Sequence, residues 1–166
     1  MAPGGKNYLL SDEIIDLIFE KRFDDAKLLI DSENDRLPIG ESHRLVALSA
    51  VLNNERGDID KSIVLMRLAI QEKPNWLPHL YRLSVILMDA EYWNDADIVL
   101  NELIALSLAK SDAYFLGDAR LRKALCLSML RREVELKRCR QESGWNCRSA
   151  ASENLNITCQ AARSIG

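Results

Sequence analysis

The stretch that decides the fold is 43–76, HRLVALSAVLNNERGDIDKSIVLMRLAIQEKPNW, and the next 34 residues, 77–110, are built on a similar plan. Apolar residues in these stretches recur every three or four positions, as the spacing of Leu45, Leu48, Val51 and Leu52 shows. This is the spacing of amphipathic helices. Gly57 and Pro74 interrupt the pattern, and both residue types end helices. The stretch therefore predicts two helices joined by a short turn.

A period of 34 residues links the two stretches. Ala50 and Ser84 lie 34 apart in the middle of one predicted helix, and Ser62 and Ala96 lie 34 apart in the helix that follows. Such a period indicates a repeat architecture. Because a small side chain leaves room for a neighbouring helix, we expect these four residues at helix contacts.

In these residues the chain resembles the tetratricopeptide repeat (TPR) family, whose pattern is W-x2-L-G-x2-Y followed by A-x3-F-x2-A-x4-P. The unit 43–76 reads Val46-x2-Ser49-Ala50-x2-Asn53, then Ser62-x3-Met66-x2-Ala69-x4-Pro74, and the unit 77–110 reads Leu80-x2-Leu83-Ser84-x2-Leu87, then Ala96-x3-Leu100-x2-Leu103. An earlier unit, 7–40, fits when Ala26 is aligned with Ala96 and a two-residue slip is allowed near Gly40. A degraded fourth unit covers 111–140 after about six extra residues.

The resemblance implies an all-α fold, a right-handed superhelical array of antiparallel helix hairpins of the α-solenoid type. The expected organisation is an N-terminal tail at 1–6, a repeat domain at 7–140 and an irregular C-terminal tail at 141–166 that contains Trp145. We expect Ser11, Asp58, Asn94 and Asp112 to be helix N-caps, because short polar side chains favour that position.

Composition and charge agree with one helical domain. The chain has 166 residues, of which 48% are hydrophobic, with a net charge of −3. Residues 120–166 hold ten Lys and Arg against four Asp and Glu, whereas residues 1–119 are acidic. We expect the basic segment to be a solvated helix face and nucleic acid not to be a partner. A local basic surface that binds nucleic acid remains an alternative.

The cysteines and the absence of apolar runs bear on location. Cys126, Cys139, Cys147 and Cys159 lie in the last quarter without a C-x-x-C pair, which argues against zinc and favours reduced thiols. The sequence shows no signal-peptide core and no run of 18 apolar residues. We therefore expect a cytoplasmic protein with no membrane contact.

The chain carries no recognisable catalytic string. Phosphate-binding loops, nucleophile elbows and zinc-protease motifs are absent, so we expect neither an enzyme nor a cofactor or metal. The histidines, His43 and His79, occupy equivalent places in successive units. Stacked helices could bring them within one or two turns of each other, but we interpret them as repeat-related surface positions. The acidic residues cluster near helix ends and turns, where helix dipoles favour them.

The TPR resemblance implies that the first helix of each unit lines a concave groove that binds an extended peptide or a partner helix. The partner-binding residues it selects are Phe19, Arg44, Val51, Asn54, Tyr81, Arg82, Val85 and Met88. We expect Phe19, Tyr81, Val85 and Met88 to be exposed and to form an apolar patch. Trp76 and Trp93 fall in turns, where packing between units is the expected role.

One TPR subclass clamps an acidic C-terminus with Lys, two Asn, Lys and Arg, and the matching residues here are Ser11, Ile15, Leu48, Pro78 and Arg82. Only Arg82 keeps the type, which favours a partner with apolar anchors over a carboxylate clamp. The expected function is a protein-interaction scaffold, as adaptor or chaperone. Self-association, as a homodimer or a larger assembly through the ends of the array, is the alternative.

Overall fold

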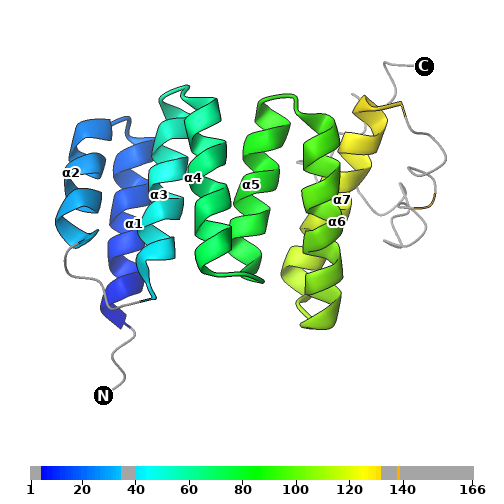
Figure 1. Cartoon of the computed structure of the whole chain (residues 1–166), viewed down its shortest axis with the longest axis horizontal. Coiled ribbons are helices and arrows are strands. Elements are labelled where there is room, and N and C mark those ends of the chain that lie inside the picture. Colours follow the sequence, from blue (N-terminus) through cyan, green and yellow to red (C-terminus); the bar gives the residue numbers. More distant parts are fainter. Residues whose placement is uncertain (1–4, 35–39, 132–137, 139–166) are drawn as a thin grey trace, which may run out of the picture. The chain divides into compact units, whose positions relative to one another are not determined.

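The computed structural model describes residues 5–34, 40–131 and 138, and within them every regular element is an α-helix (Figure 1). The predicted all-α class is confirmed. None of the described helices is long and apolar enough to cross a membrane. The chain divides into two compact units, 1–86 and 87–166.

The first unit is built from consecutive helices that pack on one another. They are α1 (Gly5–Phe19), α2 (Phe23–Asn34), α3 (Ser42–Glu55), α4 (Ile59–Glu72) and most of α5 (Leu77–Asp89). Helix α1 packs against α2 and α3, and α3 packs against α4; Figure 1 shows these helices side by side. The hairpin predicted from 43–76 is therefore α3 and α4.

The same backbone turn ends α1, α3 and α5. Lys21, Gly57 and Glu91 each adopt a left-handed conformation, with φ of 60°, 89° and 61°. The residue after each one donates its N–H to a carbonyl five positions back, which is the bond that defines a Schellman turn. Gly57 and Glu91 lie 34 residues apart and Lys21 and Gly57 lie 36 apart, so the backbone follows the period of the sequence, including the two-residue slip.

Small buried residues recur at one position of the second helix in each hairpin. Ala26, Ser62 and Ala96 each follow a left-handed turn residue by five positions, and each is fully buried. The hydroxyl Oγ of Ser62 donates a hydrogen bond to the backbone carbonyl of Ala50, 2.8 Å away. Helices α3 and α4 thus meet where both residues are small, as the 34-residue period predicts.

Two of the four predicted N-caps are wrong. Asp112 caps α7 by accepting a hydrogen bond from the backbone N–H of Phe115 (3.1 Å), and Asp58 stands at the N-cap of α4 without a side-chain bond. Ser11 lies inside α1, which begins at Gly5, and Asn94 lies inside α6, whose N-cap is Tyr92. The turn at Glu91 leads directly into α6, so this helix begins before the short polar residue.

The second unit contains α6 (Trp93–Ala109) and α7 (Ala113–Met129), which pack against each other. Asp97 on α6 is buried and forms an ion pair with the Lys123 ammonium on α7, 3.0 Å away. Lys123 was expected on a solvated basic face; instead its side chain is mostly buried, because it reaches this carboxylate. Arg122 is also paired, with Asp118 at 2.6 Å.

Cys126 is fully buried on α7, and burial raises the pKa of its thiol to about 11. A protonated, buried thiol reacts slowly. Cys139, Cys147, Cys159, Trp145 and Pro38 lie outside the described residues, as does the predicted tail at 141–166. Pro74 follows the end of α4, as predicted.

Candidate functional site

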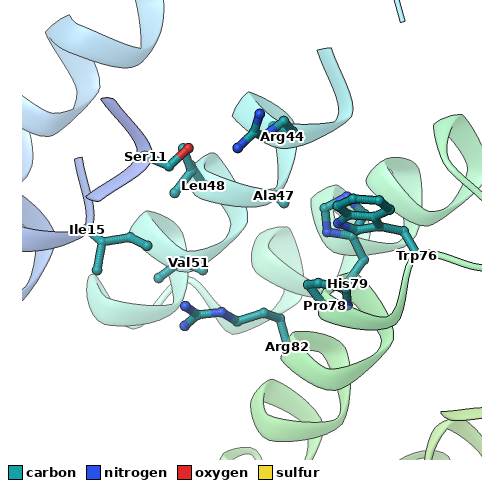
Figure 2. Close-up of a pocket in the computed structure, with 10 residues that line it drawn as sticks. All are labelled: Ser11, Ile15, Arg44, Ala47, Leu48, Val51, Trp76, Pro78, His79 and Arg82. Atoms are coloured by element: carbon teal, nitrogen blue, oxygen red, sulfur yellow. The ribbon is translucent and has the colours of Figure 1, made fainter. Parts of the chain in front are cut away.

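A pocket of about 200 Å³ opens in the first unit among α1, α3 and the start of α5 (Figure 2). Its lining residues are Ser11, Ile15, Arg44, Ala47, Leu48, Val51, Trp76, Pro78, His79 and Arg82. The lining residues of each helix lie on one face because they follow helical spacing. On α1, Ser11 and Ile15 lie four residues apart, and on α3 the lining positions run from Arg44 to Val51 at intervals of three and four. Each helix therefore turns one face toward the pocket.

Most of the lining is apolar, but two guanidinium groups lie at its edges. Arg44 comes from α3 and Arg82 from α5 (Figure 2). Arg44 forms a loose ion pair with Glu41, with an N–O distance of 3.5 Å. Arg82 is half-buried and has no ion pair with any residue that the structure describes. The pocket thus combines apolar walls with positive charge, which suits an apolar side chain beside a carboxylate.

Two aromatic rings, Trp76 and His79, line the pocket, and the ring of His43 packs against both of them. Nδ1 of His43 and Nε2 of His79 are 2.8 Å apart, so one imidazole donates a hydrogen bond and the other accepts it. The Trp76 ring stands edge-on to His43, with centroids 5.9 Å apart, and lies 6.4 Å from the His79 ring. We call His43, Trp76 and His79 the ring cluster.

The histidines were interpreted as surface residues, and this is wrong. Their exposed fractions are 3% and 4%. Each stands in the first turn of a helix, His43 on α3 and His79 on α5, and the packing of these helix starts covers both rings. The expectation that packed helices could bring the two histidines close together is confirmed.

Burial keeps both imidazoles neutral. Burial, together with the neighbouring His43 and Arg44, lowers the pKa of His79 to about 4. Burial also lowers the pKa of His43; Lys73 and Arg44 act in the same direction, whereas Glu41 and Glu72 oppose it. A neutral pair at pH 7 agrees with the short N–N distance, since two protonated rings would present a donor to a donor.

The described residues contain no group of three or more His, Cys, Asp and Glu side chains that could hold a metal. The two facing nitrogens of the ring cluster already satisfy each other. The pocket offers apolar contact, positive charge and aromatic rings to a bound group.

Three predicted partner-binding residues meet at the pocket: Arg44, Val51 and Arg82. Asn54, Tyr81 and Val85 are partly exposed, but they are not among its lining residues. Phe19 is 62% exposed at the end of α1, away from the lining.

The prediction that Met88 is exposed is wrong, because it is only 8% exposed. Leu80 and Ser84, spaced at intervals of four before it on α5, are also buried. Met88 therefore lies on the buried stripe of its helix. Met88 therefore does not belong to the exposed apolar patch that was expected from Phe19, Tyr81, Val85 and Met88.

Sequence reasoning missed Trp76 and His79 as pocket residues. Trp76 was assigned to packing in a turn, yet it is 39% exposed and lines the pocket. The available signal was the equivalent placing of the two histidines in successive units, with a tryptophan three residues before the second.

The site is thus a small pocket with apolar walls, two arginines and a ring cluster whose histidines are neutral. All of these groups belong to the first unit. When the chain is compared with models of protein families, with curated proteins and with solved structures, no match is found.

Proposed function

We propose that the pocket binds a segment of another protein, and that the chain is an adaptor or chaperone built from TPR-like repeats. The observation that carries the proposal is the pocket itself, in which one face of each of three helices converges on a space of about 200 Å³. This is the size of one or two side chains rather than of a cofactor. The proposed occupant is a peptide or helix that inserts an apolar anchor.

The backbone supports a repeat of the TPR type. Left-handed turns at Lys21, Gly57 and Glu91, each followed five residues later by a small buried residue, recur with the period of the sequence. In the proposed architecture these hairpins stack into a right-handed superhelical array whose first helices line a groove.

A second line of support comes from the positions that the TPR resemblance selects. Ser11, Ile15, Leu48, Pro78 and Arg82, which match the carboxylate-clamp positions of one TPR subclass, all line this one pocket. At four of the five positions the residue type differs from the residue type of the carboxylate clamp. The proposed occupant is therefore recognised mainly by apolar contact. The two arginines favour acidic residues beside the apolar anchor.

The test uses a displayed library of random peptides selected on the full chain, with binding measured afterwards for the selected peptides. Ala47→Leu fills the pocket and Arg82→Glu reverses its charge; each is expected to weaken binding about tenfold or more. Lys61→Glu makes the same kind of charge reversal on an exposed residue of α4 outside the pocket and should leave binding unchanged. Failure to select any peptide, or equal binding by both pocket variants and the wild type, contradicts the proposal.

Self-association is the second candidate. Leu28 on α2, Val64 on α4 and Ile98 on α6 each follow a left-handed turn residue by seven positions, and they are 71%, 65% and 66% exposed. Exposed aliphatic residues at one repeated position favour an interface. Light scattering across a concentration series tests it: a dimer that Val64→Glu dissociates would support self-association, and a monomer at every concentration would exclude it.

A further inference from the structure

The ring cluster is part of the pocket and also joins two helix starts. Trp76 and His79 line the pocket directly, and His79 is hydrogen-bonded to His43 on α3. Figure 2 shows the Trp76 indole beside the His79 side chain at this edge of the pocket. A change in the hydrogen bond between the histidines would therefore move the wall that a bound segment touches.

Protonation affects the hydrogen bond between His43 and His79 in two steps. In the neutral pair, an N–H of one ring donates to the lone pair of the other, and the 2.8 Å distance fits this arrangement. A first added proton can leave the bond in place, because an imidazolium still donates to a neutral imidazole. A second proton removes the remaining acceptor, so that two donors and two positive charges face each other. The rings must then separate.

The charged groups around the pair do not offset this effect. Glu41 and Glu72 are balanced by Arg44 and Lys73, and each carboxylate already has a partner within the described residues. Glu41 is paired with Arg44, and Glu72 accepts a hydrogen bond from the Ser42 hydroxyl at 2.8 Å. Arg44 and Arg82 at the pocket add positive charge. No excess of negative charge is therefore available to stabilise two imidazolium groups.

We infer that proton uptake by His43 and His79 separates the ring cluster, opens the Trp76 wall and releases the segment bound in the pocket. The release half of this inference rests on the proposed function, whereas the opening of the wall does not. The lowered pKa values of both histidines place the change on the acidic side of pH 6.5, so the pocket stays closed at neutral pH. The pocket would then bind its partner at neutral pH and release it at acidic pH.

The first test follows the wall without any ligand. The indole N–H of Trp76, assigned with a Trp76→Phe variant, is observed by ¹H–¹⁵N NMR from pH 7 to pH 4 in the full chain. In the wild type it should change position as the imidazoles titrate, while far-ultraviolet circular dichroism shows that the helices persist. The combined variant His43→Asn, His79→Gln places neutral amides near Nδ1 and Nε2 and keeps every neighbouring carboxylate. In this variant the Trp76 indole signal should not change position in this way between pH 7 and pH 4.

Three results would overturn the inference: an equal change in the combined variant, an unmoved Trp76 signal while the wild-type imidazoles titrate, or loss of all helical signal at the same pH. If the combined variant does not fold, His79→Gln alone provides the comparison, since one remaining imidazole cannot produce the doubly charged pair.

The second test uses a peptide selected on the pocket at pH 7. Its affinity for the wild type should fall about twofold on passing from pH 7 to pH 4, where about half of the His79 imidazoles carry a proton, and should fall less for the combined variant. If no peptide binds at pH 7, the proposed function fails, and the Trp76 titration still decides whether the wall opens. If a peptide binds equally well at both pH values, the release half of the inference fails while the proposed function stands.

Discussion

Two buried polar pairs, one in each unit, differ in charge and in surroundings. His43 and His79 share a hydrogen bond of 2.8 Å in the first unit, and both are neutral at pH 7. Asp97 and Lys123 form an ion pair of 3.0 Å in the second unit, and Lys123 also donates to the Asn101 side chain. The first pair adjoins a pocket, whereas the second pair joins α6 to α7 within the helix packing.

The His43–His79 pair can change its protonation state, whereas the Asp97–Lys123 pair joins two helices. Imidazoles exchange protons in the mildly acidic range, so the first pair can be altered without unfolding the chain. In the second pair, loss of either partner leaves a buried charge without its ion pair. In the proposed function, recognition belongs to the first unit, whereas the second pair joins α6 to α7.

Removing one partner of the ion pair should give the largest loss of stability. Asp97→Ala leaves the Lys123 ammonium mostly buried with only an amide beside it, and we expect the free energy of unfolding to fall by about 3 kcal/mol. Urea unfolding followed by circular dichroism measures the change. The combined variant Asp97→Ala, Lys123→Met should recover most of it, because no charge is then left behind. A loss below about 1 kcal/mol in the single variant would show that the ion pair contributes little to the free energy of unfolding.

Acid should weaken the first pair by a smaller amount. The pKa of His79 is about 4 in the folded chain, against 6.5 for an ordinary histidine. The unfolded state therefore takes up a proton first as the pH falls, and the stability present above pH 6.5 is lost between pH 6.5 and about 4. At pH 5 this amounts to about 2 kcal/mol from His79.

The measurement is urea unfolding at pH 7 and pH 5 for the wild type and for the variant His43→Asn, His79→Gln. The carboxylates are common to both proteins, so the difference between the two pH dependences belongs to the histidines. Identical pH dependences would mean that the histidines are not held neutral by the fold.

The turns should give the smallest effects. The turn after α3 uses Gly57 for its left-handed residue, whereas the turn before α6 uses Glu91. Glu91→Gly should raise the free energy of unfolding by about 1 kcal/mol, because glycine adopts this conformation without steric cost. Gly57→Ala should lower it by a similar amount, since an added Cβ meets no atom within 4 Å and only the backbone conformation is strained. Thermal unfolding of the two variants tests this, and a change of the same sign in both would contradict it.

The sequence predicted the parts of the fold that depend on spacing. The helical class, the break at Gly57, the end of a helix before Pro74 and the small residues Ala50 and Ser62 at a helix contact all follow from periodicity and local backbone preference. The beginnings of α1 and α6 were misplaced. A short polar residue signals a cap only when no preceding turn has already started the helix.

The site was predicted only in part, because it depends on which helix faces meet. Arg44, Val51 and Arg82 were selected by their repeat positions and do line the pocket. The burial of His43 and His79 could not be predicted from the sequence, because it depends on how the starts of α3 and α5 pack together. The pairing of Lys123 with Asp97 was hidden for a similar reason, since 26 residues separate them and their helices meet only in the folded unit.

The most direct test of the central claim, that a buried histidine pair supports the pocket wall at His79, is ¹⁵N NMR of the imidazole nitrogens at pH 6. At this pH an ordinary histidine with a pKa of 6.5 is mostly protonated. The structure predicts that His79 shows neutral imidazole signals, that the pKa of His43 lies below 6.5, and that one proton lies between Nδ1 of His43 and Nε2 of His79. Imidazolium signals from both rings at pH 6, titrating near 6.5, would contradict the buried pair and the pocket wall built on it.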